Sequence, residues 1–445
     1  MAVKSVKIPD IRIEKLIYGG DGLAHHDGAT VFVPFVLPEE RVVAEVVEQK
    51  KKFIRAQLDA VVEPSPTRVV AQCPHFAVCG GCHYQHIPYD AQLRYKTEIL
   101  RETLRRIGRV EWPGEIRVHS AQPWGCRNRA QWKVRPFAEN GAAAGGDPRL
   151  GIGYYGANST TLVPVNDCPI LSPAPIKALL SLRDALAAGA LPRTLREIEV
   201  FASPEAPAAK AKLLLTATFA GLPARATEIG AKIRAAVPDI ESLLLHDPAR
   251  ERMELDGPGF IEYETPVAKY RVGHFSFFQV NDFLVGPLQE QVTQSSAAGV
   301  GREGLALDLY AGVGLFAVPL ARHFDRVVAV ESNPAAARDL ASNVRGQGAI
   351  EVRTADVEEF LANYKAQPDL VVLDPPRAGL APGVVHRLLR LSPRRIKYLS
   401  CEPPTLARDL RLFLDAGYRI AEIRLFDLFP QTFHIETLAR LEKGS

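Results

Sequence analysis

LALDLYAGVGLFAVPLA, residues 305–321, is the stretch that decides the fold. An apolar run, a turn that contains glycine and a second apolar run predict a strand, a tight turn and a helix. Gly312 and Gly314 let the backbone approach a ligand at the start of that helix. Ala317 stands where the dinucleotide-binding fingerprint has its third glycine, so NAD is disfavoured, and two glycines alone are a weak signal.

Three further strand-like runs follow, and each ends in an acid. RVVAVE ends at Glu331, VRTAD at Asp356 and DLVVLD at Asp374. Open α/β sheets bind ligands at the carboxyl ends of their strands. Glu331 suits paired ribose hydroxyls, and Asp356 lies where an adenine edge is expected. We therefore predict a doubly wound sheet over residues 284–440 and an adenosyl ligand such as S-adenosylmethionine.

The next strand, IKYLS, delivers Cys401 to the same edge. It belongs to LSCEPPTLARDL, residues 399–410, in which two prolines precede a helix. A thiol at the end of a strand is a candidate nucleophile. The alternative is a small buried side chain with no chemical role.

Glu436 lies in the last strand-like stretch, between Ile435 and the apolar pair Leu438 and Ala439. This pattern predicts partial burial, which raises the pKa of a carboxyl group and suits a proton acceptor. The alternative is a surface glutamate on an edge strand.

Three of the six cysteines, Cys73, Cys79 and Cys82, fall within ten residues. Such density suggests a metal site, which requires a fourth ligand. Cys168 is the best candidate because a proline follows it, as one follows Cys73, and Cys126 is a weaker choice. Four thiolates fit zinc or an iron–sulfur cluster, and their chemistry does not separate the two.

Residues 6–62 contain short strand-like runs with glycine turns, which predict a small β-barrel. Residues 91–107 predict an amphipathic helix whose apolar face carries Leu93, Leu100, Leu104 and Ile107. Between 91 and 135 Lys and Arg outnumber Asp and Glu, and all three tryptophans fall there. The clustering favours an RNA partner over a solvated strand with core tryptophans.

The length and net charge of the chain restrict its domain number and its class of partner only broadly. A chain of 445 residues predicts two to four domains, and a net charge of +3 is too small to diagnose a nucleic-acid partner. The N-terminus lacks the apolar core of a signal peptide, and no apolar run has the roughly 20 residues of a membrane span. We expect no membrane partner, a cytoplasmic location and reduced cysteines.

Together these features resemble the TRAM-containing, iron–sulfur RNA uracil-5-methyltransferases that make 5-methyluridine in 23S rRNA. The resemblance spans the whole chain. It rests on IEKLIYGGDGLAHHDGATVFVPFVLPEERVVAEV (13–46), the four cysteines, LDLYAGVGLF (307–316), DPPRAG (374–379), YLSCEPPTLARDL (398–410) and FPQTFHIE (429–436).

The resemblance implies a TRAM barrel at 1–66, which is OB-like. It also implies a mixed α/β iron–sulfur and RNA-binding domain at 67–273 and a Rossmann-like methyltransferase domain at 274–445. It implies Cys401 as nucleophile, Glu436 as base and a [4Fe-4S] cluster on Cys73, Cys79, Cys82 and Cys168. The S-adenosylmethionine and uracil site is expected to contain Gln279, Tyr310, Glu331, Asp356 and Asp374.

Some positions depart from the family pattern: Glu402 stands where Asn is common, Leu315 replaces a polar residue of some members, and Cys126 stands where Tyr is usual. None of these touches the nucleophile or the base. Leu315 puts one cofactor contact in doubt.

The expected activity is methyl transfer from S-adenosylmethionine to C5 of a uridine in 23S rRNA, through a bond between Cys401 and uracil C6, by a monomeric enzyme. Uridine in the tRNA T-loop is the first alternative. The barrel argues for rRNA because the tRNA branch commonly lacks it. A non-catalytic iron–sulfur RNA-binding protein is the second alternative, and the intact Cys401 and Glu436 oppose it.

Overall fold

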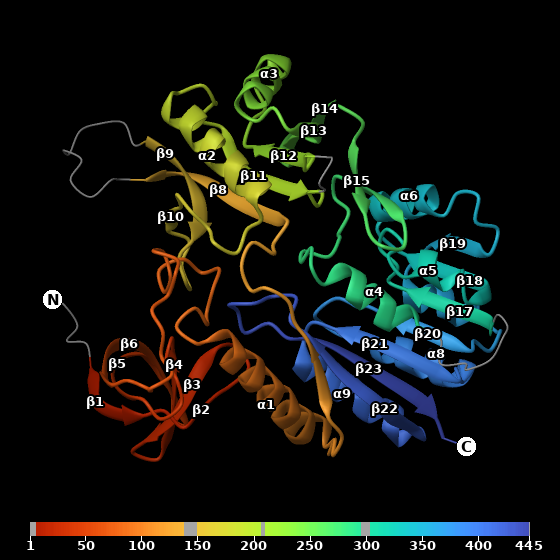
Figure 1. Cartoon of the computed structure of the whole chain (residues 1–445), viewed down its shortest axis with the longest axis horizontal. Coiled ribbons are helices and arrows are strands. Elements are labelled where there is room, and N and C mark those ends of the chain that lie inside the picture. Colours follow the sequence, from red (N-terminus) through yellow and green to blue (C-terminus); the bar gives the residue numbers. More distant parts are fainter. Residues whose placement is uncertain (1–5, 138–148, 206–209, 295–302, 445) are drawn as a thin grey trace.

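The computed structural model describes residues 6–137, 149–205, 210–294 and 303–444, which form three sheets and a two-stranded ribbon (Figure 1). The first sheet has the order β1-β5-β6-β4-β3-β2 and buries an aliphatic core that includes Ile11, Val31 and Val42. The all-β N-terminal prediction is thus confirmed. We call residues 6–63 the N-terminal module. Its strands are β1 (Lys7–Arg12), β2 (Lys15–Leu16), β3 (Asp21–His26), β4 (Ala29–Pro34), β5 (Arg41–Gln49) and β6 (Phe53–Glu63).

The second sheet lies in the middle of the chain and has the order β10-β9-β8-β11-β12-β13-β14. Helices α2 (Pro173–Ala187) and α3 (Ala226–Ala236) pack on it through Leu179, Leu182 and Ile233. The strands are β8 (Arg129–Phe137), β9 (Arg149–Tyr155), β10 (Leu162–Pro164), β11 (Leu195–Ala202), β12 (Leu213–Phe219), β13 (Ile240–Asp247) and β14 (Arg252–Asp256). A 3-10 turn η1 (Pro248–Arg250) precedes β14, and the ribbon β15 (Phe260–Glu264) and β16 (Lys269–Gly273) follows it.

The third sheet has the order β19-β18-β17-β20-β21-β23-β22-β7. Its first five strands are parallel, which confirms the doubly wound prediction, and β23 inserts antiparallel between β21 and β22. The strands are β17 (Glu303–Leu309), β18 (Phe324–Glu331), β19 (Ile350–Thr354), β20 (Leu370–Leu373), β21 (Arg395–Ser400), β22 (Tyr418–Phe426) and β23 (Glu436–Lys443). The helices are α4 (Val285–Thr293), α5 (Ala317–Leu320), α6 (Pro334–Asn343), α7 (Val357–Asn363), α8 (Pro382–Leu391) and α9 (Pro403–Asp415).

Two elements from the first third of the chain lie with this C-terminal sheet. Strand β7 (Ile116–His119) pairs with β22, and helix α1 (Tyr89–Gly108) lies beside α9 (Figure 1). Gly108 explains the close approach of the helices, because a Cβ there would lie 2.6 Å from the Ala407 carbonyl oxygen. The segment that contains α1 and β7 therefore builds the C-terminal unit, although chain order places it within 67–273.

A buried ion pair ties α1 to the segment after β22. The Lys96 ammonium is fully buried and donates to Asp427 at 2.5 Å and to the Phe429 carbonyl at 2.9 Å. Tyr89 donates to the other Asp427 oxygen at 2.9 Å. The desolvation penalty of both charges is offset only while each keeps these partners.

Two sequence expectations about this region are wrong. Ile107 is 51% exposed, because the buried face of α1 runs instead through Ile99, Leu100 and Leu104. Trp132 is fully buried in the core of the central sheet. Residues 274–281 form a turn, a bend and a bridge before α4. In the described part of the chain, none of the helices has the length and apolar character needed to cross a membrane.

Replacing Lys96 by Met should lower the free energy of unfolding by about 3–5 kcal/mol, because Asp427 then stays buried without its cation. Urea unfolding measures this loss. Lys177→Met is the matched control, since Lys177 forms an exposed pair with Asp239, and it should cost about 1 kcal/mol or less. Equal losses in the two variants would contradict the role given to Lys96.

Candidate functional site

The register of the parallel strands aligns three predicted site residues along one edge. Leu309 pairs with Val330 on one side and with Leu373 on the other. One step further, Tyr310 therefore lies between Glu331 and Asp374. Asp356 follows two residues after Thr354, the partner of Glu331. The carboxyl edge of the sheet thus carries the predicted row of acids.

The turn after β17 is shaped for close approach by a ligand. Tyr310 has φ 66°, a strained conformation for a residue with a side chain, and Gly314 has φ 92°. The positive φ of Gly314 strains any residue with a Cβ, and a Cβ there would also lie 2.6 Å from the end of the Leu340 side chain. Glu331 accepts hydrogen bonds from the Gly312 amide at 2.8 Å and the Asn333 amide at 2.7 Å. Each of its oxygens keeps a further lone pair that can accept from a hydroxyl group.

Asp356 has a structural task that the sequence pattern does not reveal. It is the N-cap of α7 and accepts from the Glu358 amide at 2.7 Å and the Glu359 amide at 3.2 Å. Its side chain is exposed at the end of the edge row. The geometry is therefore compatible with the predicted adenine contact, which would be a second role of Asp356 beside the capping of α7.

Gln279 is 5% exposed and lies in the irregular segment before α4. Two contacts hold this segment: the Asn128 amide donates to the Val280 carbonyl at 3.0 Å, and Asn281 donates to the Leu428 carbonyl at 3.2 Å. They place it where the central sheet meets the segment after β22. The predicted contact of Gln279 with cofactor or uracil stays a prediction.

Cys401 and Glu436 come together through an antiparallel register. Ser400 at the end of β21 pairs with Thr437 of β23. One step further along both strands, Cys401 lies opposite Glu436. Cys401 is half-buried, and Glu436 is 4% exposed, so the surface-glutamate alternative is excluded.

The electrostatics of this pair disfavour negative charge. Burial raises the pKa of Cys401 to about 12, and the carboxylates of Glu436 and Asp374 push it in the same direction. Burial and the Asp374 charge raise the pKa of Glu436 well above its usual range. Burial raises the pKa of Asp374 to about 7. The Arg377 guanidinium opposes the shifts of Cys401 and Glu436. A bound cation would favour the ionised forms of all three groups.

The segment 427–435 leads into Glu436, and hydrogen bonds from two other parts of the chain hold it. The Gln431 carbonyl accepts from the amides of His83 at 2.8 Å and Tyr84 at 3.0 Å. The Gln92 side chain on α1 bonds both the amide and the side chain of Gln431, at 3.0 and 2.9 Å. The position of Glu436 therefore depends on α1 and on the cysteine-containing segment.

The four predicted ligand cysteines line one cavity of about 310 Å³. Thr432 and His434 of the segment 427–435 line it too. Burial is the main cause that raises the pKa of Cys82 to about 11 and of Cys168 to about 12, and neighbouring cysteines add to both shifts. Cys126 lies outside the cavity lining, in agreement with its rejection as a ligand.

A compact metal site is not shown. Within residues 6–137, 149–205, 210–294 and 303–444, no three His, Cys, Asp or Glu side chains are gathered closely enough to hold one metal ion. The structure thus confirms that the four cysteines share a cavity, and it leaves the [4Fe-4S] cluster as a prediction.

The basic strand β8 differs from the predicted RNA surface. Arg129 pairs with Glu199, and Lys133 pairs with Glu197 on the neighbouring strand. Trp132 is in the core and does not stack on bases. Two cations of β8 are therefore paired with carboxylates of the neighbouring strand, which lie 70 and 64 residues away in sequence.

Sequence reasoning misses several residues that shape the site. It counts Lys96 among RNA-facing cations and treats Arg377 only as part of a motif. Asp308, at the end of β17, is fully buried with both carboxyl oxygens unpartnered, and burial raises its pKa well above the usual range. An acid inside the apolar run LALDL is the only signal for it.

Comparison with known proteins finds a matching family and similar proteins. Residues 260–444 match the family described as tRNA (Uracil-5-)-methyltransferase. The chain is 32% identical to the 23S rRNA (uracil(1939)-C(5))-methyltransferase RlmD of Klebsiella pneumoniae, over 99% of this chain and 97% of that protein. It is also 32% identical to an uncharacterized RNA methyltransferase of Aquifex aeolicus, over 97% and 98% of the two chains.

A solved structure is similar along nearly the whole chain. It is the Pyrococcus abyssi tRNA (uracil-54, C5)-methyltransferase in complex with S-adenosyl-L-homocysteine, with a TM-score of 0.72 and 27% identity. The match covers 97% of this chain and 100% of that one.

Arg377→Ala should slow alkylation of Cys401 by iodoacetamide at pH 8, because the guanidinium favours the thiolate and its loss raises the thiol pKa. A rise of one pKa unit reduces the thiolate about tenfold. Mass spectrometry of the Cys401 peptide measures the rate. Arg394→Ala, at the opposite end of β21, should leave it unchanged. A rate in Arg377→Ala equal to or above that of the unmodified protein would contradict this electrostatic assignment.

Proposed function

The chain belongs to the RNA (uracil-5-)-methyltransferase family, whose members use S-adenosylmethionine, and on this premise we propose that it methylates C5 of a uridine in 23S rRNA through a covalent adduct on Cys401. The observation that carries the proposal is the register that sets Cys401 opposite Glu436 beside a row of acids. A nucleophile and a buried base side by side are the two groups that the reaction requires.

Cys401 supplies the nucleophile. Uracil C5 is a poor nucleophile, and addition of the thiolate at C6 makes an enolate that raises the electron density at C5. S-adenosylmethionine supplies an electrophilic methyl group on a positively charged sulfonium. The pKa of Cys401 is raised, which disfavours the thiolate. The neighbouring Arg377 lowers this pKa, and a bound cation would lower it further, so both favour the thiolate.

Glu436 completes the reaction as the base. Once C5 carries the methyl group, its proton must leave before the thiolate can be expelled from C6. A carboxylate with a raised pKa is a stronger proton acceptor than one in water, and burial gives Glu436 this property. The target base must leave any stack to reach this edge, so an unpaired or flipped uridine is the substrate.

The acids of the sheet edge would hold the cofactor. In this proposal Glu331 accepts from the ribose hydroxyls with its free lone pairs, and Asp356 lies at the adenine end. Tyr310, Asp374 and Gln279 complete the site between cofactor and uracil. The unpartnered Asp308 and the neighbouring Asp374 make this edge favourable for a cationic sulfonium.

The N-terminal module would serve as a TRAM domain that binds RNA. Its presence does not choose the substrate, because the archaeal tRNA enzyme aligns with 97% of this chain, this module included. The relative named for 23S rRNA favours rRNA. The similarity of fold to the tRNA enzyme makes the tRNA T-loop the second candidate.

The four cysteines would hold a [4Fe-4S] cluster. Their half-buried thiols share one cavity of about 310 Å³, and a group of four irons needs such room. No step of the methyl transfer uses redox chemistry, so the cluster would have a structural or RNA-shaping role.

Covalent trapping tests the chemistry and the substrate class together. With S-adenosylmethionine and 5-fluorouridine-substituted RNA, the fluorine at C5 cannot leave as a proton, so the reaction stalls as a protein–RNA adduct on denaturing gels. We expect an adduct with 23S rRNA fragments and none with tRNA or with Cys401→Ala. An adduct with tRNA only would transfer the proposal to the T-loop, and no adduct with either RNA would contradict the covalent mechanism.

Metal analysis tests the cluster. Protein purified without oxygen should contain about four iron and four acid-labile sulfide per chain. Cys168→Ala should lose most of both, and Cys126→Ala should retain them. Zinc at about one per chain in place of iron would contradict the cluster proposal.

A further inference from the structure

Tyr18 of the N-terminal module touches both segments that carry the reactive groups. Its hydroxyl donates to Glu402 Oε2 at 2.9 Å, one residue after Cys401. Its ring meets Phe433 edge-on, with centroids 5.6 Å apart, three residues before Glu436. A side chain in the turn between β2 and β3 thus contacts the active site of the C-terminal unit.

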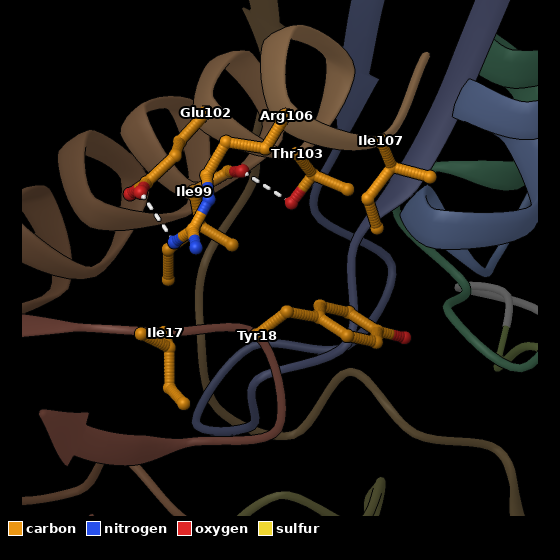
Figure 2. A pocket seen from close by; sticks show the side chains of 7 residues that line it. All are labelled: Ile17, Tyr18, Ile99, Glu102, Thr103, Arg106 and Ile107. Carbon is orange, nitrogen blue, oxygen red and sulfur yellow. Dashed lines mark hydrogen bonds and ion pairs between the residues drawn. The ribbon is translucent and has the colours of Figure 1, made fainter. Parts of the chain in front are cut away.

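The Tyr18 ring packs against the hydrophobic core on one side and borders a hollow on another. Between Tyr18 and α1 lies a hollow of about 350 Å³. Figure 2 shows Tyr18 at one end of it, with the hydroxyl pointing away from Ile17. The lining residues are Ile17, Tyr18, Ile99, Glu102, Thr103, Arg106 and Ile107. The orientation of the ring therefore depends on the hydrogen bond to Glu402 and the contact with Phe433 together with its packing on the core.

The Glu402 carboxylate lies close enough to Cys401 for its charge to act on the thiol. It is the N-cap of α9, but its carboxylate does not cap the helix and accepts from Tyr18 instead. The groups whose charges act on Cys401 are Glu436, Asp374 and Glu402, which oppose the thiolate, and Arg377, which favours it. A carboxylate held by a hydroxyl donor opposes the thiolate less than one that is free to turn toward it.

We propose that Tyr18 is a positioning residue for the reaction: it holds the Glu402 carboxylate on the side of the N-terminal module, so that the Cys401 thiol can ionise. The N-terminal module therefore completes the active site and does more than bind RNA. This inference rests on the proposed role of Cys401 as the nucleophile.

The test compares unmodified protein, Tyr18→Phe, Glu402→Gln and the double variant in the absence of RNA. The rate of Cys401 alkylation by iodoacetamide is followed against pH by mass spectrometry of the Cys401 peptide. Tyr18→Phe should move the midpoint upward by roughly half a pH unit or more, because the freed carboxylate opposes the thiolate. In the Glu402→Gln background the same change should have no effect, since no charge remains to be held.

Lys15→Ala is the matched control. Lys15 joins the same module to α1 through Glu102 at 2.5 Å, without contacting Glu402. It should leave the midpoint unchanged. A shift of the same size in Lys15→Ala, or in Tyr18→Phe with and without Glu402, would overturn the proposal, because either result makes Tyr18 a general support of the module. An unmoved midpoint in Tyr18→Phe would also overturn it.

Turnover supplies a second readout. With saturating RNA, Tyr18→Phe should lower kcat several-fold near neutral pH, recover at higher pH and keep KM. A change in KM alone would assign Tyr18 to RNA binding and overturn the proposal. Alkylation needs no RNA and no methyl transfer, so it decides the role of Tyr18 even if trapping fails to show the covalent adduct.

Discussion

The ion pair between Lys96 and Asp427 is the constraint on which the active site depends. Both side chains are fully buried, so the pair is stable only when α1 lies against the segment after β22. The same helix holds that segment a second time through Gln92 and Gln431. These contacts decide where β23 begins, and Glu436 is its first residue. A helix from the first quarter of the chain thus places the proposed base.

The placement of β23 explains why two distant residues can act together. An antiparallel strand between β21 and β22 brings its own beginning to the carboxyl edge of the parallel strands. Cys401 ends its strand there, Glu436 starts its strand there, and Asp374 and Tyr310 stand on the adjoining strand ends. Burial raises the pKa of Asp308 and of Asp374, and it suits these two acids to a ligand with positive charge.

Much of this can be predicted from the sequence, because local patterns decide strand ends. The apolar runs that end in Glu331, Asp374 and Cys401 are enough to mark the edge. Non-local partners cannot be predicted in the same way. The sequence suggests an RNA-binding cation at Lys96 and a stacking ring at Trp132, and only the fold shows that a carboxylate and a sheet core enclose them. The ligand contact of Asp356 stays a prediction, and its capping of α7 could not be predicted because it depends on where that helix starts.

The central claim is that Cys401 and Glu436 form one catalytic pair, and Glu436→Gln tests it most directly. With ordinary uridine in 23S rRNA fragments and S-adenosylmethionine, the account predicts a protein–RNA adduct that already carries the methyl group, since the C5 proton cannot leave. The adduct should vanish when Cys401→Ala is added. Normal turnover by Glu436→Gln, or an adduct without the methyl group, would contradict the pairing of nucleophile and base.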